Sequence, residues 1–456
     1  MSHPDSSTNP TSPRPAFRWL VESAWFAAMS IAVGAVSALF LTSLDEVTAL
    51  RFQFPWLLYL LPVAGVLMVW AYRRHGGRAE GGSVLLFEAI RSPAPPPAEP
   101  GAAVPRRMAP FIFFATLLTH LCGGSAGREG AAVQMGGGMA AAVCRWAGAS
   151  ERFARLLLMG GVAAGFGALF GTPLAGAVFA LEVLRPGRLP WRALLPCLAA
   201  GFLGDLACGF CGATHVPLRI TFQSGSTFWG VLGAMDFSLL GKVVFAALCF
   251  GAIGRLFVFC AHGLSGLLAR WVASPLWRVS LGGGVVVALC VVLGTRDYLG
   301  LGASSADPGA MVIPAFFSEA PASPWAWGWK MVFTLVTICS GFKGGEVTPL
   351  FFIGAAAGHA LAVVMGVHVD LLAGLGFLAV FGSASKTPLA CALMGVEIFG
   401  PTHGLLMLVV CLLASAVSGG AGLYRRPHAP RSQHAPADDA DGRPATAENP
   451  PVLREE

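Results

Sequence analysis

An arginine and a glutamate stand side by side in a glycine-rich stretch, Gly123–Gly138, between apolar segments. Ionisable residues are rare in apolar segments and generally mark an ion or substrate pathway. Glycines before a helix start leave backbone N–H groups free to face an anion, and the helix N-terminus adds partial positive charge. We therefore expect an anion site at Gly127, Arg128 and Gly130, with the Glu129 carboxyl beside it. The alternative, direct pairing of Arg128 with Glu129, is disfavoured because adjacent helix residues do not face each other.

A second stretch, Gly341–Phe352, repeats this design with glycines, charged residues and then Pro349, where a first-turn proline is tolerated. Its N–H groups are expected to face the same ion from the other half of the chain. Glu346 has two possible roles, to cap a helix N-terminus or to lie in the ion path, and capping is the favoured interpretation. The anion-binding residues predicted here are Gly345, Glu346, Val347 and Thr348.

Two isolated residues carry hydroxyl groups that suit the same chemistry. Ser83 follows two glycines at an expected helix start, and Tyr424 closes the stretch after the last apolar segment. Each hydroxyl can donate a hydrogen bond to an anion. Alone, Ser83 is typical of an ordinary helix start and Tyr424 of an interfacial aromatic residue. Beside the two glycine-rich stretches, both are predicted to bind the anion.

The composition indicates that lipid surrounds the elements holding these residues. Of 456 residues, 55% are hydrophobic and 12% are charged, about half the charged fraction of soluble domains. The pattern predicts an all-α membrane protein with ten or more helical segments, several too short to cross a bilayer. The pair Cys208 and Cys211 lacks further ligands nearby, so we expect no metal site and no cofactor.

An internal repeat divides the chain into halves. Thr172–Ala175 followed by Glu182 recurs as Thr387–Ala390 followed by Glu397, at an offset of 215 residues. A looser pair, with an offset of 217, relates the segment that begins at Gly127 to the segment that begins at Gly344. Two similar halves predict a duplicated membrane fold, inverted if each half crosses an odd number of times.

The remaining organisation follows from polarity. Residues 1–16 and 425–456 are predicted to be a disordered leader and a disordered tail. Between them, residues 17–424 form the expected membrane domain, with repeats at roughly 17–211 and 228–424. Basic residues flank the first and last apolar segments, which favours a cytoplasmic location for both termini.

These motifs resemble those of the CLC family of anion channels and proton-coupled anion transporters. Gly127–Val133, GREGAAV, is similar to the family's GREGP segment, and Gly344–Pro349, GGEVTP, to its GxFxP segment. Thr172–Arg185 resembles the helix that follows the first of these segments. Tyr424 falls where the family has its central tyrosine, and Gly81–Ser83 where it has GSGIP. The resemblance covers nearly the whole chain between its polar ends.

The resemblance implies an inverted-repeat helical fold in the lipid bilayer, a homodimer, and one anion pathway in each subunit. It makes Glu129 the gating and proton-coupling glutamate. An ionised carboxylate beside an anion site can occupy that site itself, and a protonated carboxyl can swing away and admit an ion. Binding of the anion and binding of the proton are then linked.

Several positions depart from the common pattern. Ala131 replaces the proline of GREGP, and Val183 stands where many chloride/proton exchangers have an internal proton-accepting glutamate. Glu182 is adjacent, but it is expected to point elsewhere on its helix. The GGEVTP and GREG–A–VQM forms resemble the fluoride/proton antiporter branch of the family, although that branch has threonine at the position of Ala131.

The leading hypothesis is therefore proton-coupled antiport of fluoride or chloride, and a passive CLC-type chloride channel is the alternative. Val183 favours the channel, because it cannot accept a proton. An enzyme is disfavoured because the ten histidines are dispersed and none has an evident acidic partner. No feature of the sequence indicates a nucleic-acid partner.

Overall fold

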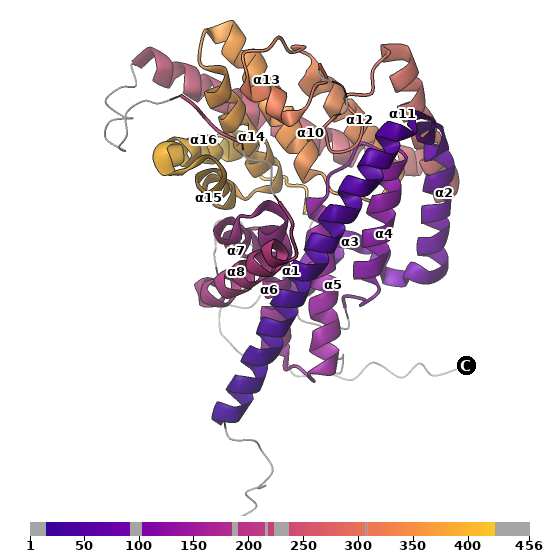
Figure 1. The fold of residues 1–456 in the computed structure, drawn as a ribbon, viewed down its shortest axis with the longest axis vertical. Helices are drawn as coiled ribbons and strands as arrows, with labels where there is room; N and C mark the ends of the chain where they lie inside the picture. The colour runs from indigo at the N-terminus through magenta and orange to yellow at the C-terminus, as the bar shows by residue number, and fades with distance from the viewer. Residues whose placement is uncertain are drawn as a thin grey trace, which may run out of the picture. The chain divides into compact units, whose positions relative to one another are not determined.

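The computed structural model describes residues 15–91, 103–184, 190–214, 218–222, 237–305, 307 and 309–424. These residues are almost entirely helical, which confirms the predicted fold class (Figure 1). The first helix, α1, already begins at Pro15, at the end of the predicted leader. The rest of that leader and the predicted tail lie outside the described residues.

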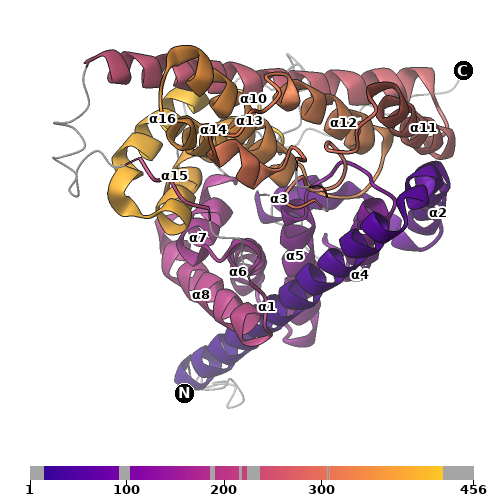
Figure 2. The ribbon, with the colours of Figure 1, turned by 45° about the horizontal axis from the view of Figure 1, so that its top comes forward.

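The first half of the repeat lies on one side of the fold and the second half on the other (Figure 2). The first half contains α1 (Pro15–Gln53), α2 (Leu61–Ala71), α3 (Gly82–Arg91), α4 (Met108–Leu121), α5 (Glu129–Trp146), α6 (Glu151–Phe170), α7 (Pro173–Glu182) and α8 (Leu194–Phe210). The second half contains α10 (Phe237–Trp271), α11 (Pro275–Leu293), α12 (Ala326–Ser340), α13 (Val347–Met365), α14 (Val369–Ser385), α15 (Pro388–Phe399) and α16 (Gly404–Val417).

Both halves contain long helices and short ones. Among the described residues, seven helical stretches are long and apolar enough to cross a bilayer, including those of α1, α6, α10 and α13. Others are too short to cross, among them α7 with 10 residues and α15 with 12. Both short helices begin with the repeated Thr-Pro-Leu-Ala segment, and their N-cap residues, Thr172 and Thr387, are buried.

Close glycine contacts pack a pair of helices in each half. A Cβ at Gly136 of α5 would lie 2.0 Å from the carbonyl oxygen of Gly161 of α6. In the second half, a Cβ at Gly354 of α13 would lie 2.1 Å from the carbonyl oxygen of Gly376 of α14. Small residues allow this approach, which is how helices associate in lipid without a hydrophobic driving force. The repeated helix starts are thus held on two equivalent rigid pairs.

The two halves also cap each other's helices. Glu182, at the end of α7, accepts hydrogen bonds from the backbone N–H groups of Leu389 and Ala390 at the start of α15, at 3.1 and 2.9 Å. Glu397 of α15 accepts from Leu174 and Ala175 at the start of α7, at 2.9 and 2.8 Å. The first N–H groups of a helix need such partners. This reciprocity explains why the glutamate repeats together with Thr-Pro-Leu-Ala, and it confirms that Glu182 points away from the position of Val183.

We expect Glu182→Gln to destabilise the protein without changing its transport stoichiometry. The amide would replace a charged acceptor and turn a donor toward N–H groups, at a cost of about 1–3 kcal/mol. Thermal unfolding in detergent should therefore shift to lower temperature. As a control, Glu22→Gln alters an outer ion pair with Arg18 and should shift stability by less than about 0.5 kcal/mol. A stable variant with altered coupling would contradict the capping role.

Candidate functional site

The two glycine-rich stretches meet at an antiparallel bridge between Gly127 and Gly345. The N–H of Gly127 donates to the carbonyl of Gly345 at 2.5 Å, and the N–H of Gly345 donates back at 2.6 Å. A Cβ at Gly345 would lie 2.6 Å from the nitrogen of Gly130, so this approach requires glycine. The starts of α5 and α13, which follow directly, therefore lie close together.

This bridge corrects two predictions. The N–H groups of Gly127 and Gly345 each donate to the other glycine's carbonyl oxygen, so they are not free to bind an anion. The two glycines instead join the helix starts. The two bridged glycines also occupy equivalent positions. Each directly precedes the N-cap residue of its helix, which is Arg128 for α5 and Glu346 for α13. The offset here is thus 218 residues, and the offset of 217 taken from the sequence is wrong by one.

Glu129 places its carboxylate at the start of the opposite helix. The carboxylate accepts hydrogen bonds from the backbone N–H and the hydroxyl of Thr348, with the N–H at 3.1 Å. The N–H of Arg128 donates to the same carboxylate, also at 3.1 Å. Only 1% of Glu129 is exposed. A negatively charged group of this chain thus occupies the helix start at which the sequence predicted an anion.

Arg128 pairs with Glu129, contrary to expectation. Its Nε lies 3.7 Å from Oε1 of Glu129, and 21% of the arginine side chain is exposed. The expectation assumed that both residues lie on a helix, but Arg128 is the N-cap and its backbone precedes the helical turn. Among the described residues, its Nε has no hydrogen-bond partner. Arg128 therefore adds positive charge beside the carboxylate, where it would also attract an anion.

Glu346 does not cap its own helix, so the favoured interpretation was wrong. Its side chain makes no capping hydrogen bond although it stands at the N-cap of α13, and Glu129 supplies that bond instead. The carboxyl of Glu346 lies close to the hydroxyl of Tyr424. Its Oε2 lies 3.8 Å from the position that a Cβ of Gly130 would take. A second carboxyl therefore lies beside the two helix starts.

Tyr424 is held by aromatic packing as well as by its hydroxyl. Only 5% of the residue is exposed. Its ring makes edge contacts with Phe87 of α3 and Phe179 of α7, with centroid distances of 5.2 and 6.4 Å. The tyrosine thus joins elements of the first half to Glu346 of the second half.

We expect Tyr424→Phe to retain the fold and to slow anion transport. The ring contacts would remain, while the hydroxyl close to Glu346 would be lost, which removes a donor worth about 1 kcal/mol to a bound anion or carboxyl. The measurement is anion efflux from liposomes, with thermal unfolding as the check on the fold. Efflux equal to that of the native protein would show that the hydroxyl lies outside the path.

Ser83 lies next to α5 and is hydrogen-bonded to Gln134, a residue that was not among the predicted site residues. The amide nitrogen of Gln134 donates to the hydroxyl of Ser83 at 3.1 Å. Gly82 begins α3 with a φ of 54°, and a Cβ at this position would lie 3.3 Å from the amide oxygen of Gln134. The buried, polar character of Gln134 in an apolar helix was the signal that could have identified it.

Val347 and Gly130 occupy the remaining predicted positions. Val347 is the first residue of α13 and is buried, with 1% of its surface exposed. Gly130 follows Glu129 in α5 and is buried against Gly345. Both therefore lie where the two helix starts face each other, and their binding of an anion stays a prediction.

Lys386 is a second residue near the site that the sequence did not identify. It ends α14 with a φ of 65°, a conformation that only glycine adopts easily, and the equivalent residue of the first half is Gly171, with a φ of 67°. Its ammonium donates to the carbonyl of Ser415 at 3.0 Å and to the hydroxyl of Ser418 at 2.5 Å. Its side chain also packs against Gly422. The lysine therefore anchors the segment that carries Tyr424.

A cavity of about 100 Å³ leads to the carboxylate. Arg128, Glu129 and Thr348 supply its polar lining. Its other walls are mostly apolar and include Phe351 and Phe377, whose rings stack with centroids 4.0 Å apart. This volume suits a few water molecules or a small ion, since a water molecule takes about 30 Å³.

The region around Val183 contains a cation in place of an acid. The guanidinium of Arg91 donates to the carbonyl oxygens of Val183 and Leu184, at 2.7 and 2.8 Å. It also donates to the carbonyl of Tyr424 at 3.3 Å. The adjacent Glu182 is engaged in capping α15. Val183 therefore has no group that can accept a proton, and the carboxylate of Glu182 faces the start of α15.

The fold and this site define a membrane protein that conducts or transports small anions. The family model described as voltage gated chloride channel matches residues 63–419, most of the chain. The chain therefore belongs to the CLC family. It is a multi-pass membrane protein that moves anions, and members of this family are channels or transporters and not enzymes.

Particular relatives are similar over most of their length. A chloride/fluoride channel protein of Pseudomonas syringae pv. tomato is 39% identical over 414 residues, covering 89% of this chain and 86% of the relative. The crystal structure of a CLC-type fluoride/proton antiporter has a TM-score of 0.81 and 33% identity, covering 90% of this chain and 98% of that one. A slow cyanobacterial Cl⁻/H⁺ antiporter has the same fold, with a TM-score of 0.73, 18% identity and coverage of 91% and 97%.

Proposed function

We propose that the chain exchanges fluoride for protons across the membrane, with Glu129 as the group that alternates between the two. The observation that carries the proposal is the Glu129 carboxylate, which accepts hydrogen bonds from the N–H and the hydroxyl of Thr348 at the start of α13. Those donors would bind an anion equally well. The carboxylate and the anion would therefore compete for one position.

Protonation would decide that competition. A neutral carboxyl interacts more weakly with the N–H groups, the helix dipole and Arg128 than a carboxylate does. A proton on Glu129 would thus release the side chain and open the site to an anion. When the proton leaves, the carboxylate would return and expel the ion. Linked binding of this kind would couple the movement of the anion to that of the proton.

Fluoride is proposed as the substrate on two grounds. Fluoride is small and strongly hydrated, so its site must supply strong donors, and the hydroxyl of Thr348 is one. The relatives described above include a protein named for chloride and fluoride and an antiporter of fluoride. Fluoride efflux from liposomes, followed with a fluoride electrode, should exceed chloride efflux. Faster chloride efflux would contradict the proposed substrate.

A passive anion channel is the second candidate, and Val183 favours it because no acid stands at that position. The discriminating measurement is whether an imposed anion gradient drives proton movement into or out of sealed liposomes. Antiport predicts that protons move in the direction opposite to that of the anion. It also predicts that they still do so when the membrane potential is clamped, which removes the driving force for a charge leak. A channel would pass anions and leave the proton gradient unchanged.

The assembly is proposed to be a homodimer with both termini in the cytoplasm. An apolar groove of about 330 Å³ supports the dimer, because it lies on the surface of α7, α8, α15 and α16. Its lining includes Leu181, Leu194, Leu393 and Leu408. A second copy of the chain would cover this groove. Molecular mass measured by light scattering, corrected for detergent, tests the dimer.

A further inference from the structure

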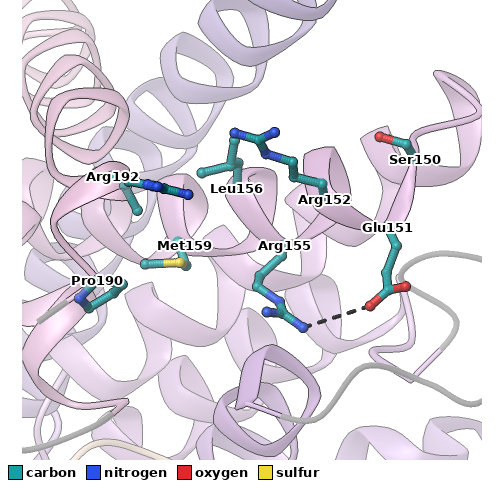
Figure 3. Close-up of a pocket in the computed structure, with 9 residues that line it drawn as sticks. Ser150, Glu151, Arg152, Arg155, Leu156, Met159, Pro190 and Arg192 are labelled. Carbon is teal, nitrogen blue, oxygen red and sulfur yellow. Dashed lines mark ion pairs between the residues drawn. The ribbon is translucent and has the colours of Figure 1, made fainter. Parts of the chain in front are cut away.

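A cavity opens where α6 and α8 begin. Its volume is about 580 Å³. Figure 3 shows the side chains around it. The lining residues are Ser150, Glu151, Arg152, Arg155, Leu156, Met159, Pro190, Arg192 and Ala193.

Three arginines give this cavity a positive charge. Arg152 and Arg155 come from the first turns of α6, and Arg192 comes from the short 3-10 helix Trp191–Ala193 before α8. Arg155 lies 3.7 Å from Glu151, which offsets one charge (Figure 3). In the described part of the chain, neither Arg152 nor Arg192 lies at ion-pair distance from a carboxylate. Two guanidinium groups are thus available to a ligand.

The position of the cavity along the helices points to the membrane surface. Glu151–Phe170 and Trp191–Phe210 are both long and apolar enough to cross a bilayer, and both begin at the cavity. Their first residues must therefore lie where hydrocarbon gives way to lipid headgroups. Trp191, with 67% of its surface exposed, is typical of this level. Leu156 and Met159 supply an apolar part of the lining.

We propose that this cavity binds the phosphate headgroup of an anionic membrane lipid. The planar fork of an arginine matches the geometry of phosphate oxygens and can bind two of them at once. The apolar lining suits the glycerol and upper acyl carbons of a lipid, which a free phosphate ion lacks. Basic pockets beside membrane helices are expected to select anionic headgroups. This binding is independent of the proposed fluoride exchange.

The test uses the full chain in nanodiscs of phosphatidylcholine with increasing amounts of phosphatidylglycerol. A ligand that binds only the folded protein raises its unfolding temperature. We expect phosphatidylglycerol to stabilise the native protein with a saturable dependence on its fraction. In the double variant Arg152→Gln/Arg192→Gln, the half-saturating fraction should rise about 10- to 30-fold, or saturation should be lost.

A matched control replaces two exposed arginines elsewhere, Arg270→Gln/Arg296→Gln, and should leave the response unchanged. Counting of co-purified phosphatidylglycerol by native mass spectrometry gives a second measurement that does not depend on the stability of the variant. An equal lipid response in the native protein and the Arg152/Arg192 variant would overturn the proposal. Equal stabilisation by inorganic phosphate in pure phosphatidylcholine would also overturn it, because the ligand would then be a soluble anion.

Discussion

We expect Glu129→Gln to abolish proton-coupled fluoride flux in reconstituted liposomes. The glutamine amide cannot take up or release a proton, and it cannot compete with an anion as a carboxylate does. Its oxygen can still accept from Thr348, but its NH₂ group would face the N–H donors that now bind the carboxylate. Fluoride efflux should therefore no longer respond to a pH gradient, and proton movement should fall to that of protein-free liposomes.

The matched control for this variant is Glu319→Gln, which alters an exposed glutamate between α11 and α12. That protein should transport fluoride and protons as the native protein does. Glu319→Gln should unfold at the temperature of the native protein, whereas Glu129→Gln should lose about as much stability as Glu182→Gln. Because Glu182→Gln is expected to keep its coupling, comparison with it separates a loss of coupling from a loss of stability. Retained, pH-dependent exchange in Glu129→Gln would contradict the role given to this carboxyl.

The second large effect is expected for Thr348→Val, which keeps the shape of the side chain and removes its hydroxyl. The hydroxyl donates to the Glu129 carboxylate, and it would donate to the anion when that carboxylate leaves. A hydrogen bond to a charged group contributes about 1.5–3 kcal/mol. Fluoride transport should therefore fall by about 10- to 100-fold at limiting fluoride concentration. Initial rates over a range of fluoride concentrations provide the measurement.

Thr348→Ser restores the hydroxyl and should recover most of the activity, whereas Thr42→Val on an exposed part of α1 should have no effect. If the valine and serine variants behave alike, the hydroxyl does not bind the transported ion. The loss would then come from packing of the buried α13 start, and the proposed fluoride site would need other donors.

The sequence was sufficient to find the two helix starts, because charged residues among glycines are conspicuous in an apolar chain. It could not show how their backbones pair. In the sequence, Gly344 and Gly345 match Gly127 of the first half equally well. Only the bridge between Gly127 and Gly345 shows that Gly345 is the equivalent residue. That ambiguity produced the offset that was wrong by one residue. It also concealed that these two N–H groups are already satisfied.

The roles of the charged side chains depend on contacts far apart in the chain. Local reasoning favoured Glu346 as the cap of α13, because it stands at the N-cap position. The cap is supplied by Glu129, 219 residues from Thr348 in the sequence. Similarly, pairing of Arg128 with Glu129 was disfavoured by a helix rule that does not apply before the first turn. Neither contact has a local signal in the sequence.

The repeat shows which long-range information a sequence does contain. Thr172–Ala175 and Thr387–Ala390 are identical, and each is followed by a glutamate at the same spacing. The structure shows that each glutamate caps the other segment's helix, so the pattern reflects a contact between the halves. A single copy would have appeared to be an ordinary helix start. The duplication showed that the two segments are related, but it did not show which N–H groups each glutamate caps.

The most direct test of competition between carboxylate and anion is the uptake of protons when fluoride binds. Purified protein in weakly buffered detergent solution would be titrated with sodium fluoride at neutral pH while the pH is recorded. The account predicts that the native protein takes up protons as fluoride saturates it, and that Glu129→Gln binds fluoride without proton uptake. Saturable fluoride binding by the native protein with no change in bound protons would contradict it.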